Sequence, residues 1–287
     1  MKKEFLKNSI IGDGKEKNFP KTRFEQMLYI LKNNFGYLFV CGIISFIFCI
    51  PCFILLFVFS YQKNLIDMEN ISNVLSFFTT TFLYLIPCVS LSGVGFVSLL
   101  YFIREISIGQ QRGFNVYFKG MKNCFLLGLI SFLIIGLSQF FMVFDVVFYS
   151  YSNYSNFVKS IFISIGVLQF IIVLIFMMFV ICLSLNYQLK FKDLIKNSFV
   201  FSFKMFFKDF GIIILAILPW VGFLFSSGVR TIVYFNVLFL FGLNYSALII
   251  NQYSLYLFDK FVNIKLFKDA YKRGLFKEKK DEKNDYY

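Results

Sequence analysis

Apolar residues occur along the chain in long runs that are separated by short, mostly basic segments. Because a helix needs about 20 largely apolar residues to cross the hydrocarbon core of a bilayer, each long run is a candidate span. The runs are Tyr37–Ser60, Phe77–Ile103, Cys124–Tyr149, Ile161–Leu185, Phe210–Phe225 and Ile232–Leu257. All are long enough to cross with room for tilt, except the fifth, which is short and interrupted by Pro219. The pattern predicts an all-α fold, a polytopic membrane helix bundle.

The positions of the basic residues predict how many runs cross the membrane. If the N-terminus is inside and all six runs cross, the inner segments hold 26 Lys or Arg, and the outer segments hold only Lys63, Lys159 and Arg230. Basic residues collect on the cytoplasmic side of membrane proteins, so the distribution favours six transmembrane helices in three hairpins, N-in/C-in. Omitting the short fifth span would place the basic tail outside.

The same pattern divides the chain into three parts. Residues 1–36 form a cytoplasmic N-terminal segment with an amphipathic helix, and residues 37–257 form the six-span transmembrane domain. Residues 258–287 form a basic cytoplasmic tail. The polar N-terminal segment is too long for a cleavable signal peptide and lacks a small-residue cleavage pattern.

Composition changes this picture mainly by what it excludes. Hydrophobic residues make up 58% of the chain and charged residues 16%, against roughly a quarter charged in soluble domains. Histidine is absent, which excludes catalysis by Ser-His-Asp, Cys-His or HExxH groups. No nucleotide-binding glycine motif occurs, so we expect no enzyme, no cofactor and no metal site.

The net charge of +13 is explained by the basic residues of the inner segments and does not indicate binding to nucleic acid. The Phe-rich, Asn-rich and Lys-rich composition is typical of an AT-rich bacterial genome, so the predicted location is a bacterial plasma membrane, multi-pass.

A basic amphipathic stretch precedes each outward-going span. The stretches end in similar sequences, at Leu31–Phe35, Met121–Phe125 and Phe207–Phe210. Phe and Lys at helical spacing are typical of helices that lie in the membrane interface, with Lys beside anionic headgroups. We therefore expect basic amphipathic interfacial helices on the cytoplasmic side, contacting anionic lipid. The alternative is that they dock a cytoplasmic partner such as a transporter subunit.

Polar side chains inside the spans are candidates for bundle-interior positions. Gln139 and Gln169 lie equally far from the turn of the second hairpin, near Tyr154, which predicts an amide pair between them. Contact with a substrate is the alternative use of these two side chains. Asp145 lies closer to the outer end and is interpreted as a hydrated interfacial carboxylate.

The sixth span carries three asparagines. Asn236, Asn244 and Asn251 fall within about an 80° arc of a helix, so their face should point into the bundle. Hydrogen bonding between helices is the favoured use of these amides, and a hydrophilic cavity for a small solute is the alternative.

Several short motifs resemble the YesL-like family of bacterial integral membrane proteins. The matching stretches are Tyr29–Phe35, Ile50-Pro51, Leu91–Phe96, Leu100–Glu105, Gly109, Phe114–Asn123 and Phe191–Ser198. The chain departs from the family pattern at Gly93-Val94, where the family tends to have Gly-Pro. The resemblance implies a several-span protein without an established activity, associated with genes for carbohydrate uptake. It favours a non-enzymatic accessory or permease-like component of a solute transport system, with carbohydrate as the solute.

Two other functions stay open. Cys49-Ile50-Pro51-Cys52 is a CxxC motif inside the first span, which would suit a membrane thiol–disulfide carrier using Cys49 and Cys52. No neighbouring Lys, Arg or His is present to favour a thiolate there. The other alternative is a structural membrane organiser without a transport role.

Overall fold

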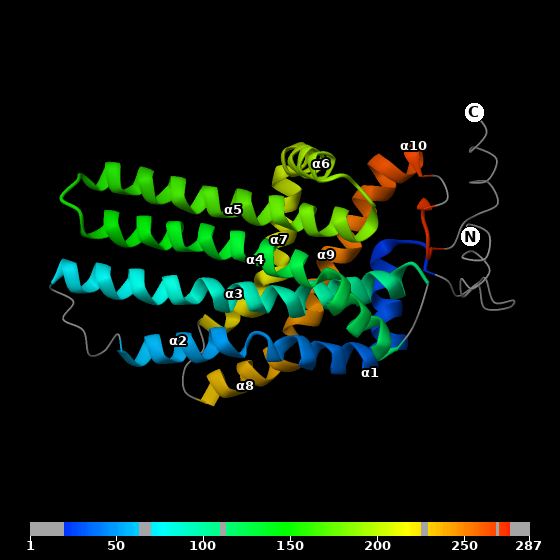
Figure 1. The fold of residues 1–287 in the computed structure, drawn as a ribbon, viewed down its shortest axis with the longest axis horizontal. Coiled ribbons are helices and arrows are strands. Elements are labelled where there is room, and N and C mark those ends of the chain that lie inside the picture. Colours follow the sequence, from blue (N-terminus) through cyan, green and yellow to red (C-terminus); the bar gives the residue numbers. More distant parts are fainter. Residues whose placement is uncertain (1–19, 63–69, 110–112, 225–228, 268–269, 276–287) are drawn as a thin grey trace, which may run out of the picture. The chain divides into compact units, whose positions relative to one another are not determined.

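The computed structural model describes residues 20–62, 70–109, 113–224, 229–267 and 270–275, with side chains left undescribed at 222–224 and 229–232. Within these ranges all regular structure is helical (Figure 1). Much of the predicted N-terminal segment (1–19), the end of the predicted tail (276–287) and the predicted outer-loop Lys63 lie outside the described residues.

Ten α-helices and two π-helical segments follow one another in the described residues. The α-helices are α1 (Arg23–Ile47), α2 (Ile50–Gln62), α3 (Ile71–Ser107), α4 (Phe114–Tyr151), α5 (Asn156–Asn186), α6 (Phe191–Lys204), α7 (Phe206–Leu224), α8 (Val229–Val237), α9 (Leu243–Phe258) and α10 (Ile264–Leu266). The π-helical segments, Leu238–Gly242 and Asp259–Asn263, come immediately before and after α9.

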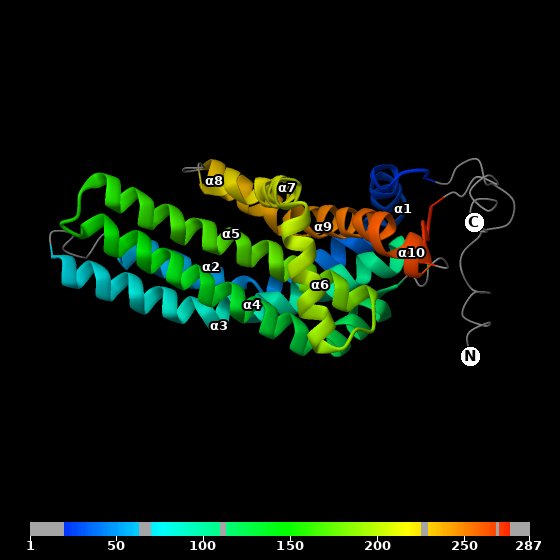
Figure 2. The same cartoon turned by 90° about the horizontal axis from the view of Figure 1, so that it is seen from above.

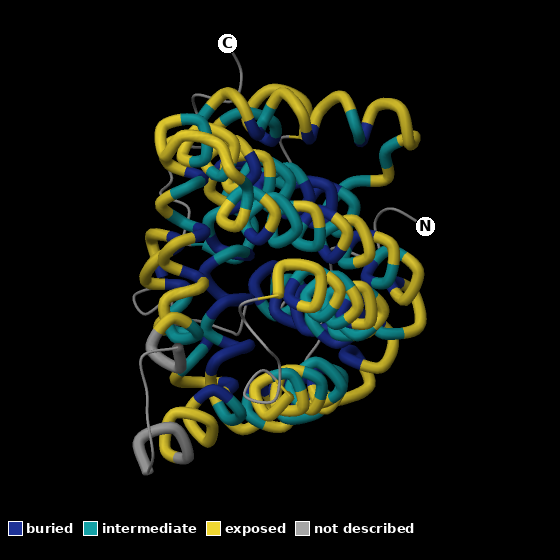
Figure 3. Tube along the Cα trace, turned by 90° about the vertical axis from the view of Figure 1, so that its left-hand side faces the viewer, coloured by how far each residue is buried: buried dark blue, intermediate teal, exposed yellow. Residues whose placement is uncertain are grey.

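The chain forms two compact units. Unit 1 comprises 1–43, 99–120 and 212–287, and unit 2 comprises 44–98 and 121–211. The parts of α3 and α4 that belong to unit 2 run side by side with α5 in both Figure 1 and Figure 2. Figure 3 shows buried residues on the inward sides of the helices and exposed residues on the outward sides.

Five helical stretches are long and apolar enough to cross a membrane. They are Arg23–Ile47, Ile71–Ser107, Phe114–Tyr151, Asn156–Asn186 and Val233–Leu266. Four of them contain all or nearly all of one predicted apolar run, and Arg23–Ile47 contains the first part of the run Tyr37–Ser60. These stretches support an all-α membrane protein. The short fifth run lies in α7, a 19-residue helix with Pro219 inside it, which is not among the five.

The first predicted span is not one continuous helix. α1 ends at Ile47, and α2 begins at Ile50 after a short turn at Phe48 and Cys49. Pro51 therefore lies in the first turn of α2, where its missing N–H and fixed φ cost nothing, so it starts a helix instead of kinking one. The rings of Phe46 and Phe53 stack across the turn with centroids 5.1 Å apart.

One of the three predicted interfacial helices is wrong as a separate element. The first is a separate helical segment within α1, because the non-helical Asn34 (φ −126°, ψ 19°) forms a kink that divides it from the rest of α1. The second forms the opening turns of α4, since no proline interrupts the helix between Phe114 and Tyr151. The third is also a helix of its own, α6, because Met205 leaves helical geometry (φ −134°, ψ 30°).

Small residues bring α3 and α4 together inside unit 2. A Cβ atom on Gly128 would lie 2.7 Å from the carbonyl oxygen of Gly93, so these backbones touch. Nearby, the Ser90 hydroxyl donates to the carbonyl of Leu129 at 2.7 Å. Gly128 thus permits the close helix approach that small residues favour in membranes.

Candidate functional site

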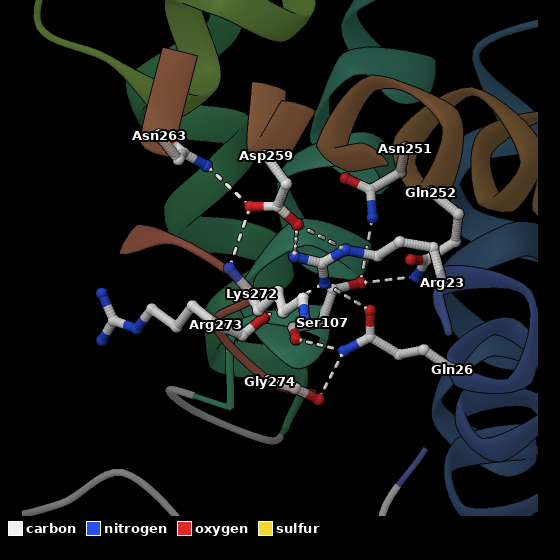
Figure 4. Close-up of polar contacts among 10 residues, drawn as sticks. All are labelled: Arg23, Gln26, Ser107, Asn251, Gln252, Asp259, Asn263, Lys272, Arg273 and Gly274. Atoms are coloured by element: carbon white, nitrogen blue, oxygen red, sulfur yellow. Dashed lines mark hydrogen bonds and ion pairs between the residues drawn. The ribbon is translucent and has the colours of Figure 1, made fainter. Parts of the chain in front are cut away.

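A buried polar cluster lies in unit 1 (Figure 4). Its residues come from the start of α1, the end of α3, α9 with the π segment that follows it, and the 270–275 segment. They are Arg23, Gln26, Ser107, Asn251, Gln252, Asp259, Asn263, Lys272, Arg273 and Gly274. The first seven are all buried, which is unusual for Arg and Asp unless they are paired.

An ion pair between Arg23 and Asp259 forms the centre of the cluster. Asp259 Oδ2 accepts from Arg23 Nη2 at 2.6 Å and from Arg23 Nε at 3.1 Å. Asp259 Oδ1 accepts from Asn263 Nδ2 at 2.9 Å and from the Lys272 backbone N–H at 3.1 Å. Four donors therefore surround one carboxylate, which is the hydrogen bonding that a buried charge requires.

Gln26 extends the network from α1 to α3. Its Oε1 accepts from Arg23 Nη1 at 2.6 Å, and its Nε2 donates to the carbonyl of Ser107 at 2.6 Å. The Ser107 hydroxyl in turn accepts from Asn251 Nδ2 at 2.9 Å and from Gln252 Nε2 at 3.0 Å. Side chains on α1 and α9 thus meet at the last residue of α3.

The 270–275 segment completes the cluster through its backbone. Arg23 Nη1 donates to the carbonyl of Arg273 at 3.1 Å, and Gln26 Nε2 donates to the carbonyl of Gly274 at 2.9 Å. Gly274 has φ +80°, and a Cβ atom there would lie 2.0 Å from the Ser107 carbonyl oxygen. Glycine is thus required at 274 both for its backbone conformation and for the space.

The arrangement is suited to holding helix ends together. Hydrogen bonds to charged groups contribute about 1.5–3 kcal/mol each, but burial of the two ions offsets much of this. Removing one ion would leave the other buried without its partner, at a cost of about 3–5 kcal/mol. The cluster therefore specifies which segments meet more than it adds net stability.

Two of the predicted polar positions lie in unit 1 as buried residues. Asn251 belongs to the cluster and donates to Ser107, which fits its predicted use in hydrogen bonding between helices. Asn244 is buried against α1, and its Nδ2 donates a long hydrogen bond of 3.4 Å to the carbonyl of Leu240, in the π-helical segment that precedes α9. Asn236, on α8, is exposed, so the three asparagines are not all buried.

The two glutamines differ in exposure. Gln139 on α4 is half-buried, whereas Gln169 on α5 is exposed. No hydrogen bond between them occurs among the described residues. Asp145 also lies on α4, half-buried, with its carboxylate against Gly166 of α5, where an added Cβ would lie 3.0 Å from Oδ2. Across the α4–α5 hairpin, Asp145 therefore packs closely on Gly166.

Gly42 on α1 makes room for Asn244. A Cβ atom at position 42 would lie 2.1 Å from Asn244 Nδ2. Gly42→Ala is expected to cost about 1–3 kcal/mol of stability as an overpacked contact, measured by thermal unfolding in detergent. Adding Asn244→Ala should restore most of the loss, because the clashing amide is gone. If the double variant is no more stable than Gly42→Ala alone, Asn244 is not the group that limits position 42.

Sequence analysis did not find the Arg23–Asp259 pair. The two residues are 236 positions apart. Arg23 was considered only in the count of basic residues on the inner side, and Asp259 was not considered. One signal was available: Asp259 and Asn263 are four residues apart, and Arg23 and Gln26 are three apart, so each pair shares a helix face. Both faces lie on the predicted inner side, beside spans one and six.

The cysteines of the CxxC motif lie in unit 2. Cys49 is buried, and Cys52 and the neighbouring-span Cys88 are half-buried. All three are free thiols. No group of three or more His, Cys, Asp or Glu placed to hold a metal ion is found in the described ranges.

Comparisons with known proteins add no relative: no family model, no curated protein and no solved structure matches the chain.

Proposed function

We propose that this integral membrane protein is a non-enzymatic accessory component of a solute-transport system, with carbohydrate as the favoured solute. The observation that carries the proposal is how the chain uses its polar side chains. Asn251 donates to Ser107, and the Asn244 amide packs on Gly42. These contacts support the interpretation that the asparagines form hydrogen bonds and packing contacts between helices. They do not favour the alternative, in which the asparagines line a hydrophilic cavity for a solute.

Six crossings with both termini inside are part of the proposal. α7 serves as the fifth span, because 26 of the 29 Lys and Arg then lie inside. With this orientation the Arg23–Asp259 cluster is at the cytoplasmic face of a bacterial plasma membrane. The YesL-like resemblance is consistent with this arrangement and is the reason for favouring carbohydrate.

α6 is the surface through which the protein contacts the inner leaflet. Leu194, Ser198 and Ser202 are buried along one side of α6, which packs against α5. On the opposite side, Lys192 and Lys196 are exposed, beside the exposed rings of Phe199 and Phe203. Exposed lysines attract anionic headgroups and the rings enter the acyl boundary, which supports anionic lipid as a partner.

Deleting the gene tests the transport role. We expect several-fold lower uptake of at least one member of a panel of radiolabelled mono- and disaccharides, restored by a plasmid copy. We also expect transporter subunits to co-purify after extraction in a mild detergent. Unchanged uptake of every sugar would overturn the transport role. If membrane proteins still co-purify in that case, the protein is a structural membrane organiser.

The CxxC motif keeps the thiol–disulfide carrier as the rival function, because Cys49 and Cys52 are free thiols. A variant with all six cysteines replaced by serine or alanine separates the two. Under the accessory proposal it supports the same sugar uptake as the wild type. Loss of function, together with a mixed disulfide trapped through Cys49 or Cys52, would favour the rival.

A further inference from the structure

The 270–275 segment is held almost entirely by backbone groups. The receptor residues Arg23, Gln26 and Asp259 contact the carbonyls of Arg273 and Gly274 and the N–H of Lys272. None of the side chains of the segment is fully buried. Recognition of this kind depends on the path of the backbone, and only Gly274 is required as a residue type.

The receptor keeps a partner for every group when the segment leaves. Arg23 retains Asp259 and Gln26, and Gln26 retains the carbonyl of Ser107. Asp259 retains Arg23 and Asn263. Departure of the segment therefore leaves neither ion of the pair without its counterpart, which is the loss that makes opening a buried ion pair costly. Water can satisfy the remaining hydrogen-bond positions.

The segment is also tethered close to its receptor. Lys272 is 13 residues beyond Asp259 in the chain, and α10 occupies part of that connection. A short tether gives the segment a high effective concentration at the receptor, so a few hydrogen bonds suffice to keep it bound. Weak contacts combined with a short tether are the properties of a site that closes readily and opens locally.

We infer that the Arg23–Gln26–Asp259 cluster is a peptide-backbone binding site and that its ligand is the chain's own 270–275 segment, held as a reversible latch. In the closed state the segment covers the end of α3 at Ser107. In the open state the receptor presents a guanidinium and an amide to carbonyls, and a carboxylate to N–H groups. The inference is independent of the proposed transport role.

Trypsin tests the latch, because Lys272 and Arg273 are cleavage sites within the bound segment. The full-length protein in mild detergent is digested, and cleavage after each residue is followed by mass spectrometry. Rates are divided by those of a free synthetic peptide with the same sequence, which removes the effect of any substitution on trypsin itself. We expect cleavage of the wild-type protein to be at least tenfold slower than cleavage of the free peptide. It should still be faster than global unfolding, measured as the rate at which the folded protein is lost at the same temperature.

Gly274→Ala is the variant that opens the latch, since its Cβ would occupy the position of the Ser107 carbonyl. We expect its normalised cleavage to rise about tenfold, toward the peptide rate, without a change in thermal unfolding. Gly36→Ala is the matched control, because nothing lies within 4 Å of a Cβ there, and it should behave as the wild type. Three results would overturn the inference: wild-type cleavage as fast as the free peptide, wild-type cleavage only at the rate of global unfolding, or Gly274→Ala cleaved as slowly as the wild type.

Discussion

Asp259→Ala is expected to lower the free energy of unfolding by about 3–5 kcal/mol, the largest effect of any single substitution in the polar cluster. The substitution leaves the Arg23 guanidinium buried without a counter-charge, and it also removes the acceptor of Asn263 and of the Lys272 N–H. The loss is measured by reversible unfolding of the purified protein in detergent with increasing SDS or urea.

A double substitution separates the ion pair from simple loss of packing. Arg23→Met with Asp259→Leu should recover most of the stability lost in Asp259→Ala, because no unpaired charge remains buried. Glu25→Ala is the matched surface control: Glu25 is exposed at the same end of α1, so its replacement should change stability by no more than about 0.5 kcal/mol. A cost below about 1 kcal/mol for Asp259→Ala would mean that the pair is not buried as described.

Gly93→Ala is the second substitution with a large expected effect. The new Cβ would lie 2.4 Å from Phe132 Cγ and 2.5 Å from the Gly128 carbonyl oxygen, and the backbone contact cannot be relieved by rotating a side chain. We expect a loss of about 1–3 kcal/mol or more, because α3 and α4 must move apart. The loss is measured as a lower midpoint of thermal unfolding in detergent.

Gly211→Ala is the control for that experiment. Gly211 lies in α7, and nothing lies within 4 Å of an added Cβ. Alanine in a helix interior should be neutral or stabilise by up to about 1 kcal/mol. Equal midpoints for the Gly93 and Gly211 variants would contradict the close contact of α3 with α4.

The fold class could be predicted because the apolar runs are long and the chain has few charges to interrupt them. Helix boundaries could not be predicted as well. The kink at Asn34 falls within Leu31–Phe35, where the first interfacial stretch was predicted to end, whereas the second stretch continues into α4 without a break. The break before α2 falls two residues ahead of Pro51 within an apolar run, where hydropathy is uniform and gives no signal.

The candidate site was predicted only where a polar residue stood out inside a span. Asn244 and Asn251 were identified for that reason, and both are buried. Arg23 and Asp259 were not identified because charges are expected at span ends, and their pairing depends on segments that are far apart in the chain. The backbone contacts of Gly274 cannot be predicted from the pattern of side chains along the chain. An isolated glycine in a basic tail does, however, indicate a position with an unusual backbone conformation.

Single-cysteine labelling of a cysteine-free background tests the central claim, an integral membrane protein of six spans with its polar cluster on the inner side. Cysteines are placed at Ser155 in the α4–α5 turn, at Gln188 between α5 and α6, and at Lys260 after α9. We predict that an impermeant maleimide applied to intact spheroplasts labels only the Ser155 position, while the other two react after the membrane is opened. Labelling of the Lys260 position from outside would show that α7 does not cross, and would contradict the account.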